Sequence, residues 1–234
     1  MDRRRFNSAA GGTLACIILL AHARAHALSL ADLTDGEASQ GLKTALEKGA
    51  LAAISLLGRK DGFLGNDKVR IPLPGFLEDA GKLLKTFGQG KRVDELVNAM
   101  NRAAETAVPM ANDLLMGAVK SMSVTDAKNI LTGGDTSVAQ FFASKTREPL
   151  GVTFLPVVTR ATQKVELASK YNRVASKAVG IGLVSKNEAN IEQYVTGKTL
   201  DGLYFVIGEE ERKIRRDPVG AGSDILKKVF SLLK

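Results

Sequence analysis

Four polar residues close together in the sequence are the best candidates for chemistry in this chain: Asn98, Asn101, Arg102 and Glu105. On a helix, Asn98, Asn101 and Glu105 share one face because they recur at spacings of three and four residues, and Arg102 flanks that face. Amide and guanidinium groups arranged in this way can bind a polar ligand through forked hydrogen bonds. We therefore predict a binding site here, while the same pattern is also ordinary for a solvated helix face.

The exposure of this face decides what a substitution should do. Replacing both Arg102 and Glu105 by Ala should cost less than about 1 kcal/mol if the two side chains are exposed. A large loss of thermal stability would instead place them in a buried structural network.

A second charged group follows near the end of the chain, over residues 209–216. Glu209 with Lys213 and Glu211 with Arg215 are each four residues apart in the order that favours ion pairs on a helix. The pattern indicates a self-neutralising helix. An anion-binding surface for lipid headgroups or another polyanion is the alternative interpretation.

Residues 61–67 contain several oxygen-bearing side chains, which suggests a calcium loop. Calcium loops need ligands at alternate positions and a closing bidentate carboxylate, whereas Phe63 and Leu64 occupy the middle of this segment. We therefore expect a plain turn and no metal site.

The first 27 residues predict a signal peptide. Three arginines precede an apolar run over residues 11–21, and Ala25-His26-Ala27 provides a small-residue cleavage site, with Ala25 as an alternative cut two residues earlier. Cys16 is a poor lipidation site, and the arginines fit the twin-arginine export pattern only loosely. We predict cleavage after Ala27, and periplasmic or secreted localisation.

Residues 28–234 contain no His, no Cys and no Trp, since His22, His26 and Cys16 all lie in the predicted leader. This composition excludes Ser-His-Asp and Cys-His catalysis, zinc sites built from thiolate and imidazole, and disulfides. We expect no cofactor. A carboxylate-dependent periplasmic hydrolase stays an alternative, and it would have to draw on Glu105, Asp113, Tyr171, Tyr194 and Tyr204.

Hydrophobic periodicity predicts that residues 28–234 form a single all-α domain of eight to ten helices. Apolar residues recur at helical spacing through most of this stretch, and Pro72 and Pro74 mark one short extended segment at residues 69–73. The expected helices include a short one over residues 138–145 and a long one over 152–170. Two further helices are expected over residues 188–195 and 200–216, and a final one begins at Ser223.

The predicted partners are an envelope protein or an anionic lipid surface. The isoelectric point is about 9.6, but aromatic residues make up only 5% and occur mainly at core spacing, so we do not expect nucleic acid. The final helix, with Lys227, Lys228 and Lys234 beside an apolar face, suits either a membrane surface or docking onto the core. We predict no transmembrane helix after the leader.

Several stretches together resemble the bacterial family known as domain of unknown function 4197. These stretches are Val69-Arg70-Ile71-Pro72-Leu73-Pro74, Met100-Asn101-Arg102-Ala103-Ala104-Glu105, Thr125-Asp126-Ala127-Lys128-Asn129-Ile130-Leu131, Leu200-Asp201-Gly202-Leu203-Tyr204 and Glu210-Glu211-Arg212-Lys213-Ile214-Arg215. The resemblance implies an exported, mostly periplasmic helical protein and no established activity. We therefore expect an envelope protein that binds or scaffolds without catalysis.

Overall fold

The computed structural model describes residues 35–180 and 190–217, and all regular structure in these ranges is helical. The elements are α1 (Asp35–Gly58), α2 (Gly75–Thr86), α3 (Gly90–Ala107), the 3₁₀-helix η3 (Val108–Ala111), α4 (Asn112–Lys120), α5 (Val124–Thr132), α6 (Ser137–Thr162), α7 (Glu166–Gly180) and α8 (Ile191–Arg216). The predicted all-α class is confirmed.

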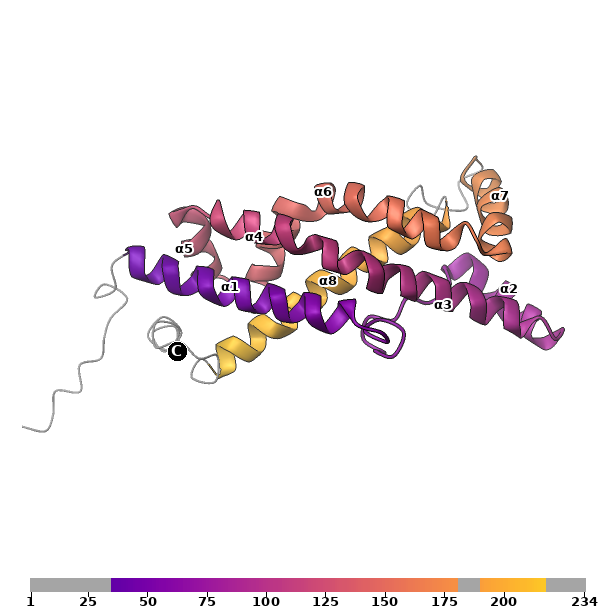
Figure 1. Cartoon of the computed structure of the whole chain (residues 1–234), viewed down its shortest axis with the longest axis horizontal. Coiled ribbons are helices and arrows are strands. Elements are labelled where there is room, and N and C mark those ends of the chain that lie inside the picture. The colour runs from indigo at the N-terminus through magenta and orange to yellow at the C-terminus, as the bar shows by residue number, and fades with distance from the viewer. Residues whose placement is uncertain (1–34, 181–189, 218–234) are drawn as a thin grey trace, which may run out of the picture.

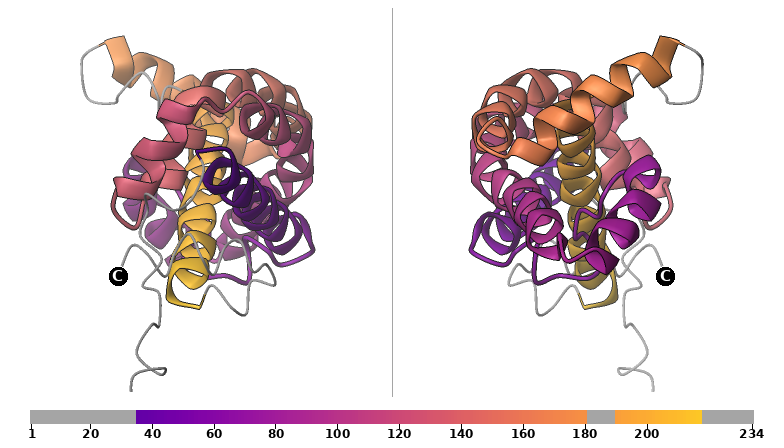
Figure 2. Two further views of the ribbon diagram at one scale, coloured as in Figure 1. Left: turned by 90° about the vertical axis from the view of Figure 1, so that its left-hand side faces the viewer. Right: turned by 90° about the vertical axis from the view of Figure 1, so that its right-hand side faces the viewer.

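The helices form an elongated bundle in which α8 crosses the middle (Figure 1). Helix α8 packs against α6, α1 and α3, and the end-on views show it surrounded by the other helices (Figure 2). Helices α6 and α8 run antiparallel, because Val138 near the start of α6 contacts Glu211 near the end of α8, while Arg147 contacts Asp201. This pair of long helices positions most of the polar groups considered below.

The apolar stripes expected from the sequence form one continuous core. Leu42, Leu46 and Leu57 of α1 are buried, as are Phe142 and Phe154 of α6. The connection between α1 and α2 joins this core through Phe63, which is fully buried against α8. A Cβ atom on Gly202 would lie only 2.8 Å from the Phe63 ring, so the absence of a side chain at Gly202 lets this loop pack closely against α8.

Two predicted helix breaks are wrong. Helix α6 is continuous from Ser137 to Thr162, through Pro149 and Pro156, and ends well before residue 170. Buried Phe142, Leu150 and Phe154 hold both sides of Pro149 in the core, and this packing outweighs the backbone hydrogen bond that a proline removes.

The second false break lies near the start of α8. The helix runs without interruption from Ile191 to Arg216, across Gly197. A Cβ atom at Gly197 would meet nothing within 4 Å, so this glycine marks neither a turn nor a close approach. Buried Val195 and Leu200 on either side keep this part of α8 on the core.

Of the segment predicted to be extended, residues 69–73, Val69 lies in a turn and residues 70–73 are irregular backbone, and no strand is assigned in the described parts of the chain. No helix in those parts has the length and apolar character needed to cross a membrane. The predicted signal peptide, the start of the chain up to Thr34 and the expected helix from Ser223 lie outside the described residues.

Candidate functional site

Asn101 is fully buried and holds the proline-flanked segment onto α3. Its side-chain oxygen accepts a hydrogen bond from the backbone N–H of Ile71 at 2.8 Å. Its Nδ2 donates to the carbonyl of Ile71 at 2.9 Å and to that of Val97 at 2.8 Å. The carboxamide thus supplies both hydrogen bonds that a neighbouring strand would have made to Ile71.

Glu105 holds the preceding turn in the same way. Its Oε1 accepts hydrogen bonds from the backbone N–H groups of Phe63 and Leu64, both at 3.1 Å. Its Oε2 accepts from Arg102 Nη1 at 2.5 Å, and Arg102 Nη2 donates to Asp61 Oδ1 at 2.6 Å. The hydrogen bond to Glu105, followed by the one to Asp61, raises the pKa of the Arg102 guanidinium above its ordinary value. Asp61 itself has a positive φ of 65°, a strained conformation that these contacts help to hold.

The structure therefore brings three of the four predicted site residues together with the loop between α1 and α2. We call Asn101, Arg102 and Glu105 the loop clamp. Both carboxylate oxygens of Glu105 accept hydrogen bonds from other groups of this chain. The side-chain oxygen and nitrogen of Asn101 are likewise hydrogen-bonded within the chain. A ligand-binding role stays a prediction, for which only exposed Asn98 and the outer part of Arg102 are accessible.

The charged run of α8 contains a second buried carboxylate. Glu211 Oε2 accepts from the backbone N–H of Val138 at 3.0 Å, which places a negative charge at the N-terminus of α6. Arg215 lies 2.8 Å from Glu211 and also donates to the carbonyl of Ile130. The predicted pair of Glu211 with Arg215 is confirmed, whereas Lys213 contacts Glu210 at 2.7 Å in place of Glu209.

A trough of about 340 Å³ runs between α6 and α8 and is open to solvent. The lining residues recur at helical spacing on both helices: Ala139, Gln140, Ala143 and Arg147 on α6 with Thr136 just before it, and Asp201, Tyr204, Phe205, Gly208 and Arg212 on α8. Each set covers three turns, or about 16 Å at 1.5 Å per residue. The volume lies at the lower end of the range typical of small-molecule sites, about 300–1,000 Å³.

The middle of the α6–α8 trough is apolar and its two ends are charged. Ala139, Ala143, Gly208 and the ring of Phe205, which is 40% exposed, form the middle. Gly208 and Ala139 let the two helices approach closely at the floor of the trough, since a Cβ atom on Gly208 would lie 3.6 Å from Ala139.

One end of the trough is lined by a cation, the guanidinium of Arg212. Arg212 forms an ion pair with Glu209, and Lys68 Nζ lies 3.1 Å from the same carboxylate. Two cations thus share one anion, and these contacts, with the Lys68 hydrogen bond first, hold the pKa of Glu209 below its ordinary value. At the other end Arg147 and Asp201 neutralise each other at 2.7 Å.

Tyr204 forms part of the trough wall without offering a reactive hydroxyl. Its oxygen lies 2.9 Å from Thr146 Oγ1, and burial raises the pKa of its phenol above the ordinary value, with smaller opposing effects from Thr146 and Arg147. A tyrosine of this kind stays protonated at neutral pH.

The residues named for a hydrolase do not converge on one site. Glu105 is bound in the loop clamp, Asp113 is exposed and accepts from Asn112 at 3.0 Å, and Tyr194 donates to the carbonyl of Pro72. Tyr171 is buried in the core. Within residues 35–180 and 190–217, no three His, Cys, Asp or Glu side chains are grouped so as to hold a metal ion.

The sequence analysis did not predict the trough. Ala139 and Ala143 are four residues apart on α6 and Gly208 is a small residue of α8, a pattern that ordinary helix packing also produces. Only the antiparallel contact of α6 with α8 shows that the small residues of the two helices face a shared space.

Comparison with known proteins gives one match. The searches of curated proteins and of solved structures returned none. The family model described as "Protein of unknown function (DUF4197)" matches residues 32–231, in agreement with the resemblance seen in the sequence. A match over this much of the chain shows the family, and the chain belongs to the DUF4197 proteins of unknown function.

Proposed function

We propose that this protein is an exported, non-enzymatic binding protein of the cell envelope that takes up a small anionic amphiphile in the α6–α8 trough. The observation that carries the proposal is the combination of an apolar middle with the Arg212 guanidinium at one end. A molecule with a carboxylate or phosphate head and a short hydrocarbon body matches this polarity.

The apolar middle supports the hydrocarbon part of the ligand. Phe205 is 40% exposed on the trough wall, and covering its ring would remove apolar surface from water. Each buried methylene of a ligand contributes about 0.8 kcal/mol of transfer free energy, so about ten methylenes, with the ion pair to the head offsetting part of the cost of association, are needed for micromolar binding.

The Arg212 end supports the anionic head. Arg212 lines this end of the trough, and Gln140 donates to Thr136 at 3.2 Å on the opposite helix side of the same end. The guanidinium is a planar donor that suits a carboxylate or phosphate oxygen. Its ion pair with Glu209 lies at a partly exposed position, where an isolated pair contributes little and Arg212 is able to turn toward a ligand.

The envelope location rests on the predicted signal peptide. Three arginines, an apolar run and Ala25-His26-Ala27 favour cleavage after Ala27 and release into the periplasm or medium. Intact-mass measurement of the protein from a periplasmic fraction tests this part. A chain beginning at Leu28 supports it, and a full-length cytoplasmic chain overturns it.

Calorimetric titration with matched amphiphiles tests the ligand class. Dodecanoate and dodecyltrimethylammonium carry the same chain and opposite charges, and both are used below their micellar concentrations. Dodecanoate should bind at one site at least about tenfold more tightly than the cation, because only it pairs with Arg212. Equal binding of the two, or no binding of either, overturns the proposal.

Matched variants locate the binding. Ala143→Leu should fill the trough, and Arg212→Gln should remove the cation, and each should weaken dodecanoate binding about tenfold or more. The controls are Ala52→Leu on α1 and Arg160→Gln on α6, which change exposed side chains away from the trough and should bind dodecanoate like the parent protein. Control variants that lose as much affinity as the trough variants would show that the site lies elsewhere.

The hydrolase alternative stays a prediction that no contact in the structure favours over binding. Incubating the protein with dodecanoate esters tests it in the same series. Ester cleavage abolished by Asp113→Asn or Glu105→Gln would support the hydrolase.

A further inference from the structure

The last turn of α2 and the residue that follows it carry two strongly exposed apolar side chains, Leu83 and Phe87. Phe87 is 76% exposed and Leu83, one helical turn earlier, is 60% exposed. Phe87 follows the last residue of α2, and Gly88 reverses the chain with a φ of 75°. Figure 1 shows this turn at the far end of the long axis, opposite the start of α1.

Basic residues surround this apolar tip. Residues 82–92 read Lys-Leu-Leu-Lys-Thr-Phe-Gly-Gln-Gly-Lys-Arg, with four basic and no acidic side chains. Lys85 pairs with Asp94 at 3.2 Å, but both side chains are more than half exposed, so the pair is weak and open to exchange. Lys91 is exposed and has no carboxylate partner within residues 35–180 and 190–217.

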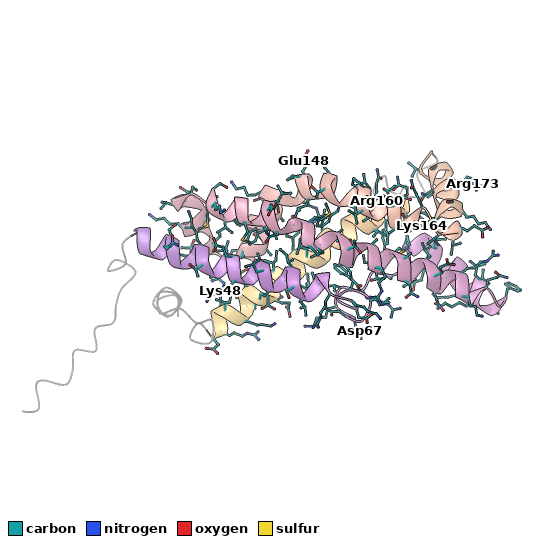
Figure 3. All side chains as sticks on the ribbon, in the orientation of Figure 1. Lys48, Asp67, Glu148, Arg160, Lys164 and Arg173 are labelled. Carbon is teal, nitrogen blue, oxygen red and sulfur yellow. The ribbon has the colours of Figure 1, made fainter. Side chains whose placement is uncertain are left out.

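The neighbouring end of α6 and helix α7 extend the positive charge. Figure 3 places Arg160, Lys164 and Arg173 toward the same end of the molecule as the α2–α3 turn. All three side chains are exposed, and none is paired with a carboxylate in the described part of the chain. Residues 160–180 carry five basic and one acidic side chain, whereas residues 75–95 are balanced at four each.

We propose that this end of the molecule docks on an anionic lipid bilayer, with Phe87 and Leu83 entering the headgroup region and the basic side chains of α2, α3, α6 and α7 contacting lipid phosphates. Peripheral membrane proteins bind in this way when a few apolar side chains project beyond a cationic surface. A projecting tip suits a soft bilayer better than it suits a second folded protein, which would need a matching groove. The proposal is independent of the α6–α8 trough and adds a docking surface to it.

Vesicle co-sedimentation of the chain from residue 28 to residue 234 tests this inference. The protein should bind vesicles with 30% phosphatidylglycerol in phosphatidylcholine at least tenfold more tightly than pure phosphatidylcholine vesicles. Binding should fall steeply as salt rises from about 0.05 to 0.5 M, because screening shortens the reach of surface charges. Equal binding to the two kinds of vesicle, or none to either, overturns it.

Two sets of variants distinguish membrane binding through the tip from nonspecific binding by other exposed apolar or basic side chains. Leu83→Ser with Phe87→Ser should reduce binding about tenfold or more, whereas Val152→Ser, which removes a 72% exposed apolar side chain from α6, should have little effect. Arg160→Gln, Lys164→Gln and Arg173→Gln together should also reduce binding at least tenfold. The matched control is Arg59→Gln, Lys60→Gln and Arg70→Gln, three exposed cations on the α1–α2 loop.

Each result decides the inference. Loss of vesicle binding in both sets with the controls unchanged supports it. Parent-like binding of the Leu83 and Phe87 variant, or equal loss in the controls, overturns it. Capture of a specific protein that depends on Phe87, without vesicle binding, would replace the bilayer by a protein partner. Circular dichroism of each variant shows whether it is folded, and dodecanoate titration shows whether the trough is intact.

Discussion

Glu105→Ala gives the sharpest test of the loop clamp. The substitution removes the acceptor from the buried N–H of Phe63 and from the partly buried N–H of Leu64, and water has poor access to both. Each buried donor left without a partner costs about 1–3 kcal/mol, so we expect a loss of about 3 kcal/mol in the free energy of unfolding. Arg102 loses one of its two anions but is 36% exposed, so it adds little.

Urea unfolding followed by circular dichroism measures this loss. Glu95→Ala is the matched control, since Glu95 is an exposed carboxylate on α3, and it should change stability by less than about 0.5 kcal/mol. Hydrogen exchange at Phe63 and Leu64 should accelerate in Glu105→Ala, while exchange in α6 and α8 should follow only the global loss. A Glu105→Ala protein within about 0.5 kcal/mol of the parent would refute the clamp.

Three further predictions follow from other contacts. Glu211→Ala should cost about 3–5 kcal/mol in urea unfolding, because it leaves Arg215 and the Val138 N–H without the buried carboxylate they share, and a loss below about 1 kcal/mol would contradict this. Gly202→Ala should destabilise the protein by about 1–2 kcal/mol in thermal unfolding, because its Cβ would lie 2.8 Å from Phe63, whereas Gly197→Ala on the same helix should stabilise it by about 0.5–1 kcal/mol. The pKa of Asp126 is held below its ordinary value of 3.8, mainly by the backbone N–H of Ser123. The stabilisation from Asp126 is therefore present above pH 3.8 and is lost as the pH falls through the lower pKa that Asp126 has in the folded protein. The difference in free energy of unfolding between the parent and Asp126→Asn should narrow only in that acid range.

The sequence alone predicts the fold class and most helices, because the apolar stripes repeat at helical spacing over many turns. The break expected before residue 152 is absent for a reason that local patterns do not contain. Buried Phe142 and Phe154 keep the segments on either side of Pro149 in one helix, so tertiary packing decides where local propensity is ambiguous. The same applies across Gly197 in α8.

Two of the polar residues selected from the sequence, Asn101 and Glu105, are buried and hydrogen-bonded, but their spacing on one helix does not reveal which groups they contact. Asn101 and Glu105 contact backbone groups 30 to 42 positions earlier in the chain, and no periodicity encodes those contacts. Glu211 is similar, since its sequence neighbours indicate a surface ion pair while its partner Val138 lies 73 residues away. The trough depends on the packing of two helices and was therefore visible only in three dimensions.

Photo-crosslinking tests the proposed binding site most directly. A dodecanoate analogue with a diazirine in its chain is irradiated with the protein, and the modified peptides are identified by mass spectrometry. We predict that crosslinks concentrate in residues 136–147 and 201–212 and that unlabelled dodecanoate competes them away. Crosslinks spread over α1, α3 and α7, or insensitive to the competitor, would contradict binding in the α6–α8 trough.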